Sequence, residues 1–153
     1  MGRYLLVFFL AAAGIFVVDQ SVKALFLEGF RYYTECIDLI LVYNRGVAFS
    51  MFAFLEEWLK WIQLLLIGGI AGYFLVRREF CYVFPAGMLI GAGLSNVFDR
   101  FLHGGVVDYV YWHCGFEFAV FNFADVAIDA AVLWLLLLNF RPALCKSHEK
   151  PSG

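Results

Sequence analysis

Four aspartates stand close to the ends of long apolar stretches of this sequence, namely Asp19, Asp99, Asp108 and Asp125. An ionised aspartate at the centre of a bilayer costs about 3 kcal/mol even on a lenient insertion scale, so each one needs a reason. Two carboxylates in a dry, partly apolar site repel each other, so one keeps its proton while the other ionises. Such a pair supplies a base for a water molecule and an acid for a leaving amine, as in aspartic proteases. Spacing alone does not choose the pair among the four.

Further polar residues share helix faces with these aspartates, because residues three or four apart are neighbours on a helix. The groups are Asp19 with Lys23, Asn96 with Asp99 and Arg100, and Asn122 with Asp125. Asp108 follows Gly104 and Gly105, which allow a tight backbone approach, and we expect its loop to dip back toward the apolar helices. No serine pairs with a histidine or a lysine at this level, so a serine mechanism is disfavoured. Asp19 and Lys23 alone could also form a purely structural ion pair.

The composition indicates a small membrane protein with several spans. The chain has 153 residues, 63% of them hydrophobic, and a mean hydropathy of +0.81. Only 16% of the residues are charged, against about 25% in an ordinary soluble domain. The net charge is -2 and the basic residues are scattered, so the chain offers no basic field for nucleic acid. Nucleic acid is therefore excluded as a partner.

Four apolar stretches are long enough to cross a bilayer, which takes about 20 helical residues. They cover about residues 4–26, 58–76, 80–98 and 118–140. The first resembles a signal peptide, but its small residues stand in the middle of the run, so we expect a retained helix. No linker or internal repeat is visible, so residues 1–153 are predicted to form a single integral membrane domain with a disordered tail from Arg141 onward.

The basic residues predict the orientation of these spans. One side of the membrane would carry Arg3, Arg77, Arg78, Arg141, Lys146 and Lys150, against only Glu79 and Glu149. By the positive-inside rule this side, with both termini, is cytoplasmic. Chain direction then places all four aspartates near the opposite, outer boundary, beside the two long loops. Polar residues that converge at one depth from several helices and loops are typical of a buried site.

The first outer loop, residues 28–57, is predicted to form a small β-rich subdomain. It is rich in β-favouring residues up to Tyr43, and Asn44-Arg45-Gly46 is typical of a turn. Farther on, apolar residues of segment 51–58 alternate with glutamates, which indicates a short interfacial helix. The predicted fold class is a membrane α-helical protein, with four transmembrane helices, a small extracytoplasmic β-rich subdomain and a short interfacial helix.

The four cysteines, Cys36, Cys81, Cys114 and Cys145, show no spacing typical of a metal site, so we expect no bound metal. Cys81 and Cys145 are interpreted as small apolar residues in the packing. Cys36 and Cys114 could form a disulfide only if both loops face an oxidising compartment, and we expect them to stay unpaired.

Five motifs carry a resemblance to a known family. They are Asp19-Gln20 with Lys23, Tyr43-Asn44-Arg45-Gly46-Val47-Ala48-Phe49-Ser50, Gly93-Leu94-Ser95-Asn96-Val97-Phe98-Asp99-Arg100, Gly105-Val106-Val107-Asp108-Tyr109 and Phe121-Asn122-Phe123-Ala124-Asp125. In this order, and over nearly the whole chain, they resemble the lipoprotein signal peptidase (signal peptidase II) family, four-span aspartic proteases of the bacterial inner membrane. The resemblance implies Asp108 and Asp125 as the catalytic dyad. It also implies substrate-binding or supporting roles for Asp19, Lys23, Asn44, Gly46, Asn96, Asp99, Arg100 and Asn122.

The resemblance further implies an activity. Members of the family remove the signal peptide from diacylglyceryl-modified prolipoproteins, immediately before the lipidated cysteine. The expected partners are therefore a lipidated prolipoprotein and membrane lipid, with no cofactor and no metal. We expect a monomer in the bacterial inner membrane, with its active site on the periplasmic side.

Two other functions remain open on the sequence alone. A small proton- or ion-translocating subunit also carries intramembrane acids, but it would place them at several depths. Here only Asp129, one turn below Asp125, lies deeper. We interpret Asp129 as a polar residue facing a hydrated cleft, or alternatively as a third acid that perturbs the dyad. The other open function is an inactive scaffold that has kept the same fold.

Overall fold

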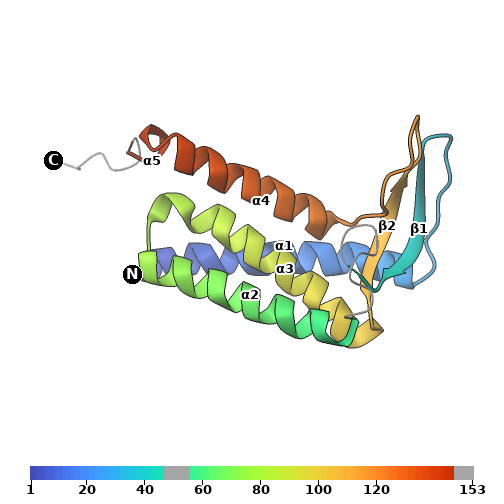
Figure 1. Ribbon diagram of the computed structural model, residues 1–153, viewed down its shortest axis with the longest axis horizontal. Coiled ribbons are helices and arrows are strands. Elements are labelled where there is room, and N and C mark those ends of the chain that lie inside the picture. Colours follow the sequence, from blue (N-terminus) through green and yellow to red (C-terminus); the bar gives the residue numbers. More distant parts are fainter. Residues whose placement is uncertain (47–55, 147–153) are drawn as a thin grey trace.

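Four long helices run side by side in the computed structural model, which describes residues 1–46 and 56–146 (Figure 1). They are α1 (Gly2–Leu27), α2 (Glu56–Arg77), α3 (Val83–His103) and α4 (Phe123–Phe140). Each of the 4 is long and apolar enough to cross a membrane. The protein is thus a helical membrane protein, and the four predicted spans are confirmed as helices.

The structure differs from the predicted spans at the ends of α3 and α4. Beyond residue 98, α3 continues to His103 and ends where Gly104 adopts a left-handed conformation with a φ of 72°. The polar residues Asp99 and Arg100 therefore lie inside its last turns. At the other end of the site, α4 begins at Phe123 instead of near residue 118, because Asn122 is extended and caps the helix.

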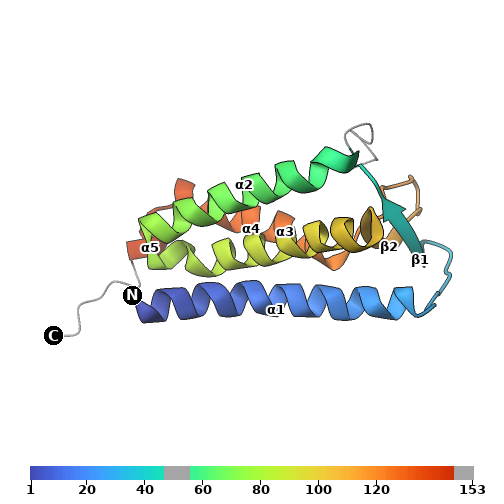
Figure 2. The ribbon, with the colours of Figure 1, turned by 90° about the horizontal axis from the view of Figure 1, so that it is seen from below.

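The bundle is centred on α3, which contacts α1, α2 and α4 and lies between α1 and α2 in Figure 2. Two glycines of α3 face α1. A Cβ on Gly87 would lie 2.6 Å from the Phe8 carbonyl oxygen, and Gly91 lies against the Ala12 carbonyl. Small residues four apart allow transmembrane helices to approach closely. This close approach brings the polar residues farther along α1 and α3 within hydrogen-bonding distance of each other.

A two-stranded antiparallel sheet lies at one end of the bundle, opposite the end where α1 begins and α4 ends (Figure 1). Its strands are β1 (Ile37–Asn44) and β2 (Val106–Trp112), and their register pairs Val42 with Asp108. The small β-rich subdomain predicted for the first outer loop is confirmed, and the strand that pairs with β1 comes from the second loop. The segment around Asp108, which was expected to be a loop that dips inward, is the strand β2. Pairing with β1 satisfies its backbone N–H and C=O groups.

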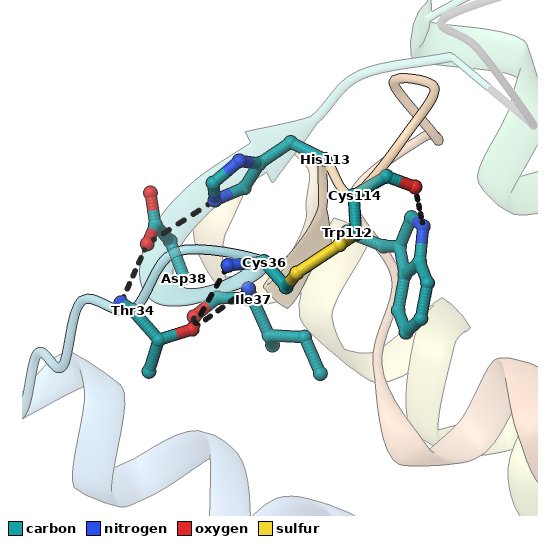
Figure 3. Close-up of a disulfide and its surroundings, with 7 residues drawn as sticks. All are labelled: Thr34, Cys36, Ile37, Asp38, Trp112, His113 and Cys114. Atoms are coloured by element: carbon teal, nitrogen blue, oxygen red, sulfur yellow. Dashed lines mark hydrogen bonds and ion pairs between the residues drawn. A yellow bond between two sulfur atoms is a disulfide. The ribbon is translucent and has the colours of Figure 1, made fainter.

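A disulfide between Cys36 and Cys114 closes one end of this sheet (Figure 3). Cys36 precedes β1 and Cys114 follows β2, and the pairing of Ile37 with Trp112 brings the two cysteine Cα atoms to 4.4 Å. The Thr34 hydroxyl accepts the Ile37 N–H at 2.8 Å and fixes the chain before the strand. The expectation that these cysteines stay unpaired was wrong, because the strand register sets their distance and spacing along the chain does not reveal it.

A second disulfide joins Cys81, in the 3-10 turn Phe80–Tyr82, to Cys145 in the short helix α5 (Ala143–Lys146). The interpretation of these two cysteines as simple packing residues was wrong. The helix that follows α4 brings Cys145 next to the turn between α2 and α3, with the Cα atoms 5.4 Å apart. The tail expected to be disordered from Arg141 thus contains a helix at Ala143–Lys146, and residues 147–153 of that prediction lie outside the described residues.

The predicted interfacial helix falls largely on residues that the structure does not describe. Within the described part, α2 already begins at Glu56, and Trp58 belongs to this transmembrane helix. Residues 51–55 of the predicted segment lie outside the described residues.

Candidate active site

Lys23 of α1 is a buried cation between two carboxylates. Its Nζ lies 2.6 Å from Asp19 Oδ2 and 2.6 Å from Asp99 Oδ2, and it donates to Asn96 Oδ1 at 2.9 Å. All three charged residues are at most 1% exposed. A buried charge is tolerated when it is paired and hydrogen-bonded, which is the case here. The expected pair of Asp19 and Lys23 is present, and Asp99 joins it from α3.

The same two carboxylates also hold the backbone of two neighbouring elements. Asp19 Oδ1 accepts the N–H of Ala124, in the first turn of α4, at 2.8 Å. Asp99 Oδ2 accepts the N–H of Val107, in β2, at 3.1 Å. Hydrogen bonds to a charged acceptor are stronger than those between neutral groups. An aspartate directly follows each of these two amides, so both aspartates are fixed relative to α1 and α3.

Asn122, which is fully buried, bonds both of these following aspartates. Its Nδ2 donates to Asp108 Oδ1 at 2.7 Å. Its Oδ1 accepts the Asp125 N–H at 2.9 Å, and its own N–H donates to Asp125 Oδ2 at 3.1 Å. The last two bonds form a capping box, which sets the first turn of α4. One asparagine thus holds Asp108 and Asp125 beside each other.

Two more asparagines each donate to one of these carboxylates. Asn96 Nδ2 donates to Asp125 Oδ1 at 2.9 Å, and Asn44 Nδ2 donates to Asp108 Oδ2 at 3.0 Å. The Asn44 oxygen accepts the Gly46 N–H at 3.1 Å, so the side chain also stabilises the turn that follows β1. Each of the four carboxylate oxygens therefore accepts a hydrogen bond from an asparagine.

Arg100 of α3 holds the same turn from the other side. Its Nη1 donates to the Arg45 carbonyl oxygen at 3.4 Å and its Nη2 donates to the Gly46 carbonyl oxygen. Gly105 lies against this turn, where a Cβ would be 3.1 Å from the Asn44 carbonyl oxygen. A glycine at this position allows the turn to approach the start of β2 closely. The turn predicted at Asn44-Arg45-Gly46 is thereby fixed over Asp108.

These groups open onto a cavity of about 510 Å³. It is walled by residues of α2, α3, α4, β1 and β2 and by segment 118–121. Asp108 and Asp125 line it, and Asp129 lines it one turn farther along α4, where its side chain is exposed. Asp19 and Asp99 do not belong to its lining within the described residues. The four aspartates singled out in the sequence therefore divide into Asp108 and Asp125, which line the cavity, and Asp19 and Asp99, which hold Lys23.

The structure brings together the residues singled out in the sequence and adds three others. Gln20 Nε2 donates to Asp99 Oδ1 at 2.7 Å and to Ser95 Oγ at 2.8 Å, and Ser95 Oγ donates to Asp19 Oδ2 at 2.6 Å. Gln20 and Ser95 stand inside the quoted motifs, and their place beside predicted site residues is the only sequence feature that points to them. Gln63 of α2 lines the cavity and lies outside every motif. Its signal is that it is a lone amide in an apolar span.

Burial, and after it the charge of Asp125, raise the pKa of Asp108 from its ordinary value of 3.8 to about 7. The hydrogen bonds from Asn44 and Asn122 act in the opposite direction, because they favour the ionised carboxylate. Near neutral pH the Asp108 carboxyl group is therefore divided between its protonated and ionised forms.

This pKa predicts a pH-dependent stability. Because the folded pKa of about 7 exceeds the ordinary 3.8, the folded state holds the proton more tightly than the unfolded state. The contribution of Asp108 to the free energy of unfolding is full below pH 3.8 and is lost as the pH rises through about 7. Thermal unfolding in detergent at pH 5 and pH 8 measures it. The decrease should be smaller in Asp108→Asn, and an identical decrease in both proteins would contradict the prediction.

Comparison with known proteins places this arrangement in a family. The model of the family described as signal peptidase (SPase) II matches residues 11–141. The lipoprotein signal peptidase of Sulfurimonas denitrificans is 64% identical over 147 residues, which are 96% of each chain. That of Sulfurovum sp. is 61% identical over 139 residues, covering 90% of this chain and 95% of the relative.

Solved structures show the same fold. A structure described as a bacterial membrane enzyme matches with a TM-score of 0.77 and 18% identity, covering 100% of this chain and 94% of the other. A second one, described in the same terms, has a TM-score of 0.72 and 19% identity, covering 90% of this chain and 92% of the other. With the family match over most of the sequence and relatives above 60% identity, the chain belongs to the signal peptidase II family of aspartic peptidases.

Proposed function

We propose that this protein removes signal peptides from diacylglyceryl-modified prolipoproteins by hydrolysing the bond before the lipidated cysteine, with Asp108 and Asp125 as the catalytic pair. The relatives named lipoprotein signal peptidase support the substrate. The observation that carries the assignment is that Asn122 bonds both carboxylates at the edge of one cavity. The other two candidate aspartates are engaged with Lys23 and with backbone amides.

The pair activates one water molecule for attack. In the reactive form Asp108 carries the proton, which its raised pKa of about 7 allows in a large fraction of molecules near neutral pH. The ionised Asp125 takes a proton from water, and the water oxygen attacks the scissile carbonyl carbon. Asp108 gives its proton to the carbonyl oxygen, so that a tetrahedral intermediate forms without a covalent bond to the protein. The proton on Asp125 then passes to the leaving nitrogen as the C–N bond breaks, and Asp108 regains its proton from the collapsing intermediate.

The position of the site in the bundle supports a membrane-bound substrate. The site lies at the sheet end of the helices, whereas Arg3, Arg77 and Arg141 lie at the other end. By the positive-inside rule that other end is cytoplasmic, so both termini face the cytoplasm and the site faces the outer side of the inner membrane. The scissile bond of a substrate anchored by acyl chains lies at the same boundary. We also propose that the chain acts as a monomer and a single domain.

The cavity offers room for an apolar, membrane-embedded substrate. It lies between α2 and α4, which make no extensive contact with each other in the described part of the chain. Apolar residues line it beside the carboxylates, namely Phe118, Phe121, Val126 and Ile128. A signal peptide or an acyl chain can therefore approach the carboxylates from the lipid without first crossing water.

A gel-shift cleavage assay in detergent or lipid tests this function. The purified protein is given one prolipoprotein in its diacylglyceryl-modified form and in its unmodified form, each with and without EDTA. We expect cleavage of the lipidated form alone, with the new N-terminus at the modified cysteine and no effect of the chelator. Equal cleavage of both forms would contradict the substrate, and activity lost with EDTA and restored by metal would contradict the mechanism. No cleavage by well-folded protein would favour an inactive scaffold.

A further inference from the structure

The side-chain oxygen of Gln63 is buried in the wall of the cavity and accepts no hydrogen bond from the described residues. Gln63 lies in α2, whereas Asp108 and Asp125 lie in β2 and α4, and all three line the same cavity. Buried polar atoms without a partner are rare in native structures, because each one loses its hydrogen bonds to water and gains none from the protein. An orphaned acceptor in the wall of a binding cavity points to a donor on the molecule that the cavity holds.

The other side-chain amides that line the cavity, Asn44 and Asn96, have hydrogen-bond donors for their oxygens. Asn44 Oδ1 accepts a hydrogen bond from the Gly46 N–H, and Asn96 Oδ1 accepts one from Lys23 Nζ. The amide nitrogens of both asparagines donate to the two carboxylates. Their oxygens are therefore engaged within the protein, and the oxygen of Gln63 is the one available to a substrate donor.

The position of Gln63 in α2 places this acceptor near the sheet end of the bundle, where Asp108 and Asp125 also lie. It lies seven residues after Glu56, about 10 Å along the helix at 1.5 Å per residue, and thus near the sheet end of the bundle. The exposed side chains of Trp58 and Trp61 precede it, and tryptophan is enriched where a membrane meets water. A peptide held at this level has little water with which to bond its N–H groups.

We propose that Gln63 Oε1 accepts a hydrogen bond from a backbone N–H of the signal peptide close to the scissile bond, and so acts as a positioning residue for the substrate. This inference rests on the proposed function. An extended peptide has no internal hydrogen bonds, so each N–H that leaves water needs an acceptor. The bond from the α2 wall holds the peptide backbone in the cavity that Asp108 and Asp125 also line, and so contributes to binding.

The variant Gln63→Met tests the contact, because methionine keeps an unbranched side chain of similar length and lacks the acceptor. With a lipidated prolipoprotein peptide we expect KM to rise about tenfold, equivalent to about 1.4 kcal/mol of binding. We expect kcat to stay within about twofold, since a bond made equally in the ground and transition states affects binding alone. The matched control is Asn139→Met, the same change at an exposed amide of α4 that does not line this cavity in the described residues, and it should leave KM unchanged.

A second measurement separates a direct contact from a structural effect. Peptides in which single backbone N–H groups before the scissile bond are replaced by ester oxygens are compared in wild type and Gln63→Met. At one position the ester should raise the KM of the wild type about tenfold. The same ester should leave the KM of Gln63→Met unchanged, because that variant already lacks the interaction. An unchanged KM in Gln63→Met, or no ester position that distinguishes the two proteins, would overturn the contact.

Binding of a non-cleavable lipidated peptide distinguishes failure of this contact from failure of the proposed function. If the wild type cleaves the substrate while Kd and KM are unchanged in Gln63→Met, the function stands and the contact is overturned. If Gln63→Met binds the peptide about tenfold more weakly but the wild type cleaves nothing, the contact stands and the catalytic function is overturned.

Discussion

Replacing Asp108 or Asp125 with asparagine should lower kcat/KM for prolipoprotein cleavage by about a thousandfold or more. Asparagine keeps the size of the side chain but neither accepts a proton from water nor donates one to the scissile carbonyl at neutral pH. Because the two carboxylates act as a unit, the double variant should be little worse than either single one. Cleavage of the lipidated substrate, followed by gel shift over hours, measures all three losses.

The fold should survive these substitutions, although each variant asparagine keeps one acceptor oxygen and turns its NH2 group toward the second donor, which costs about 1–3 kcal/mol. Thermal unfolding in detergent checks this, and the stability difference between wild type and Asp108→Asn should be smaller at pH 8 than at pH 5, because burial disfavours the carboxylate that wild type carries at the higher pH. The matched control is Asp129→Asn, the same chemical change in the same cavity one turn away. We expect its kcat/KM to stay within about threefold of wild type. Cleavage that survived in a dyad variant would move the catalytic pair to Asp19 or Asp99.

Local spacing predicted those parts of the site that lie within one helix. The four-residue spacing of Asp19 and Lys23 gave their ion pair, and the spacing of Asn122 and Asp125 gave their common face, which the structure shows as a capping box. The ion pair follows from helix periodicity, and the capping box follows from the three-residue spacing between an N-cap residue and its partner. The choice of Asp108 and Asp125 from four aspartates did not follow from spacing, and it came from the resemblance of the motifs.

Contacts between distant segments were beyond the sequence alone. The ion pair of Lys23 with Asp99 requires α1 and α3 to approach closely, which depends on packing at Gly87 and Gly91. The strand character of β2 depends on pairing with β1 from another loop, and a one-residue change of register would turn its side chains to the other face. The Cys36–Cys114 disulfide depends on the same register. Periodicity within a segment carries no information about such pairings.

The second large effect is expected at Lys23, which touches neither the cavity nor, by our proposal, the substrate. Lys23→Met should lower the free energy of unfolding by about 3–5 kcal/mol, because it leaves the buried carboxylates of Asp19 and Asp99 without their cation. Denaturant titration of the protein in detergent measures the loss. The control Lys60→Met removes the exposed ion pair with Glu57, whose atoms lie 2.9 Å apart, and should cost about 1 kcal/mol at most.

The same variant tests how the buried charges support the site. Asp19 and Asp99 hold the start of α4 and of β2 through backbone amides, so losing Lys23 should also displace the elements that carry the catalytic pair. We therefore expect Lys23→Met to lose cleavage activity at temperatures at which it is still folded. Adding Asp99→Asn to Lys23→Met removes one of the uncompensated charges and should recover part of the lost stability. It should not recover activity, because Asp99 then no longer holds the Val107 amide with a charged acceptor. Full activity in folded Lys23→Met would show that the carboxylates keep their places without the cation.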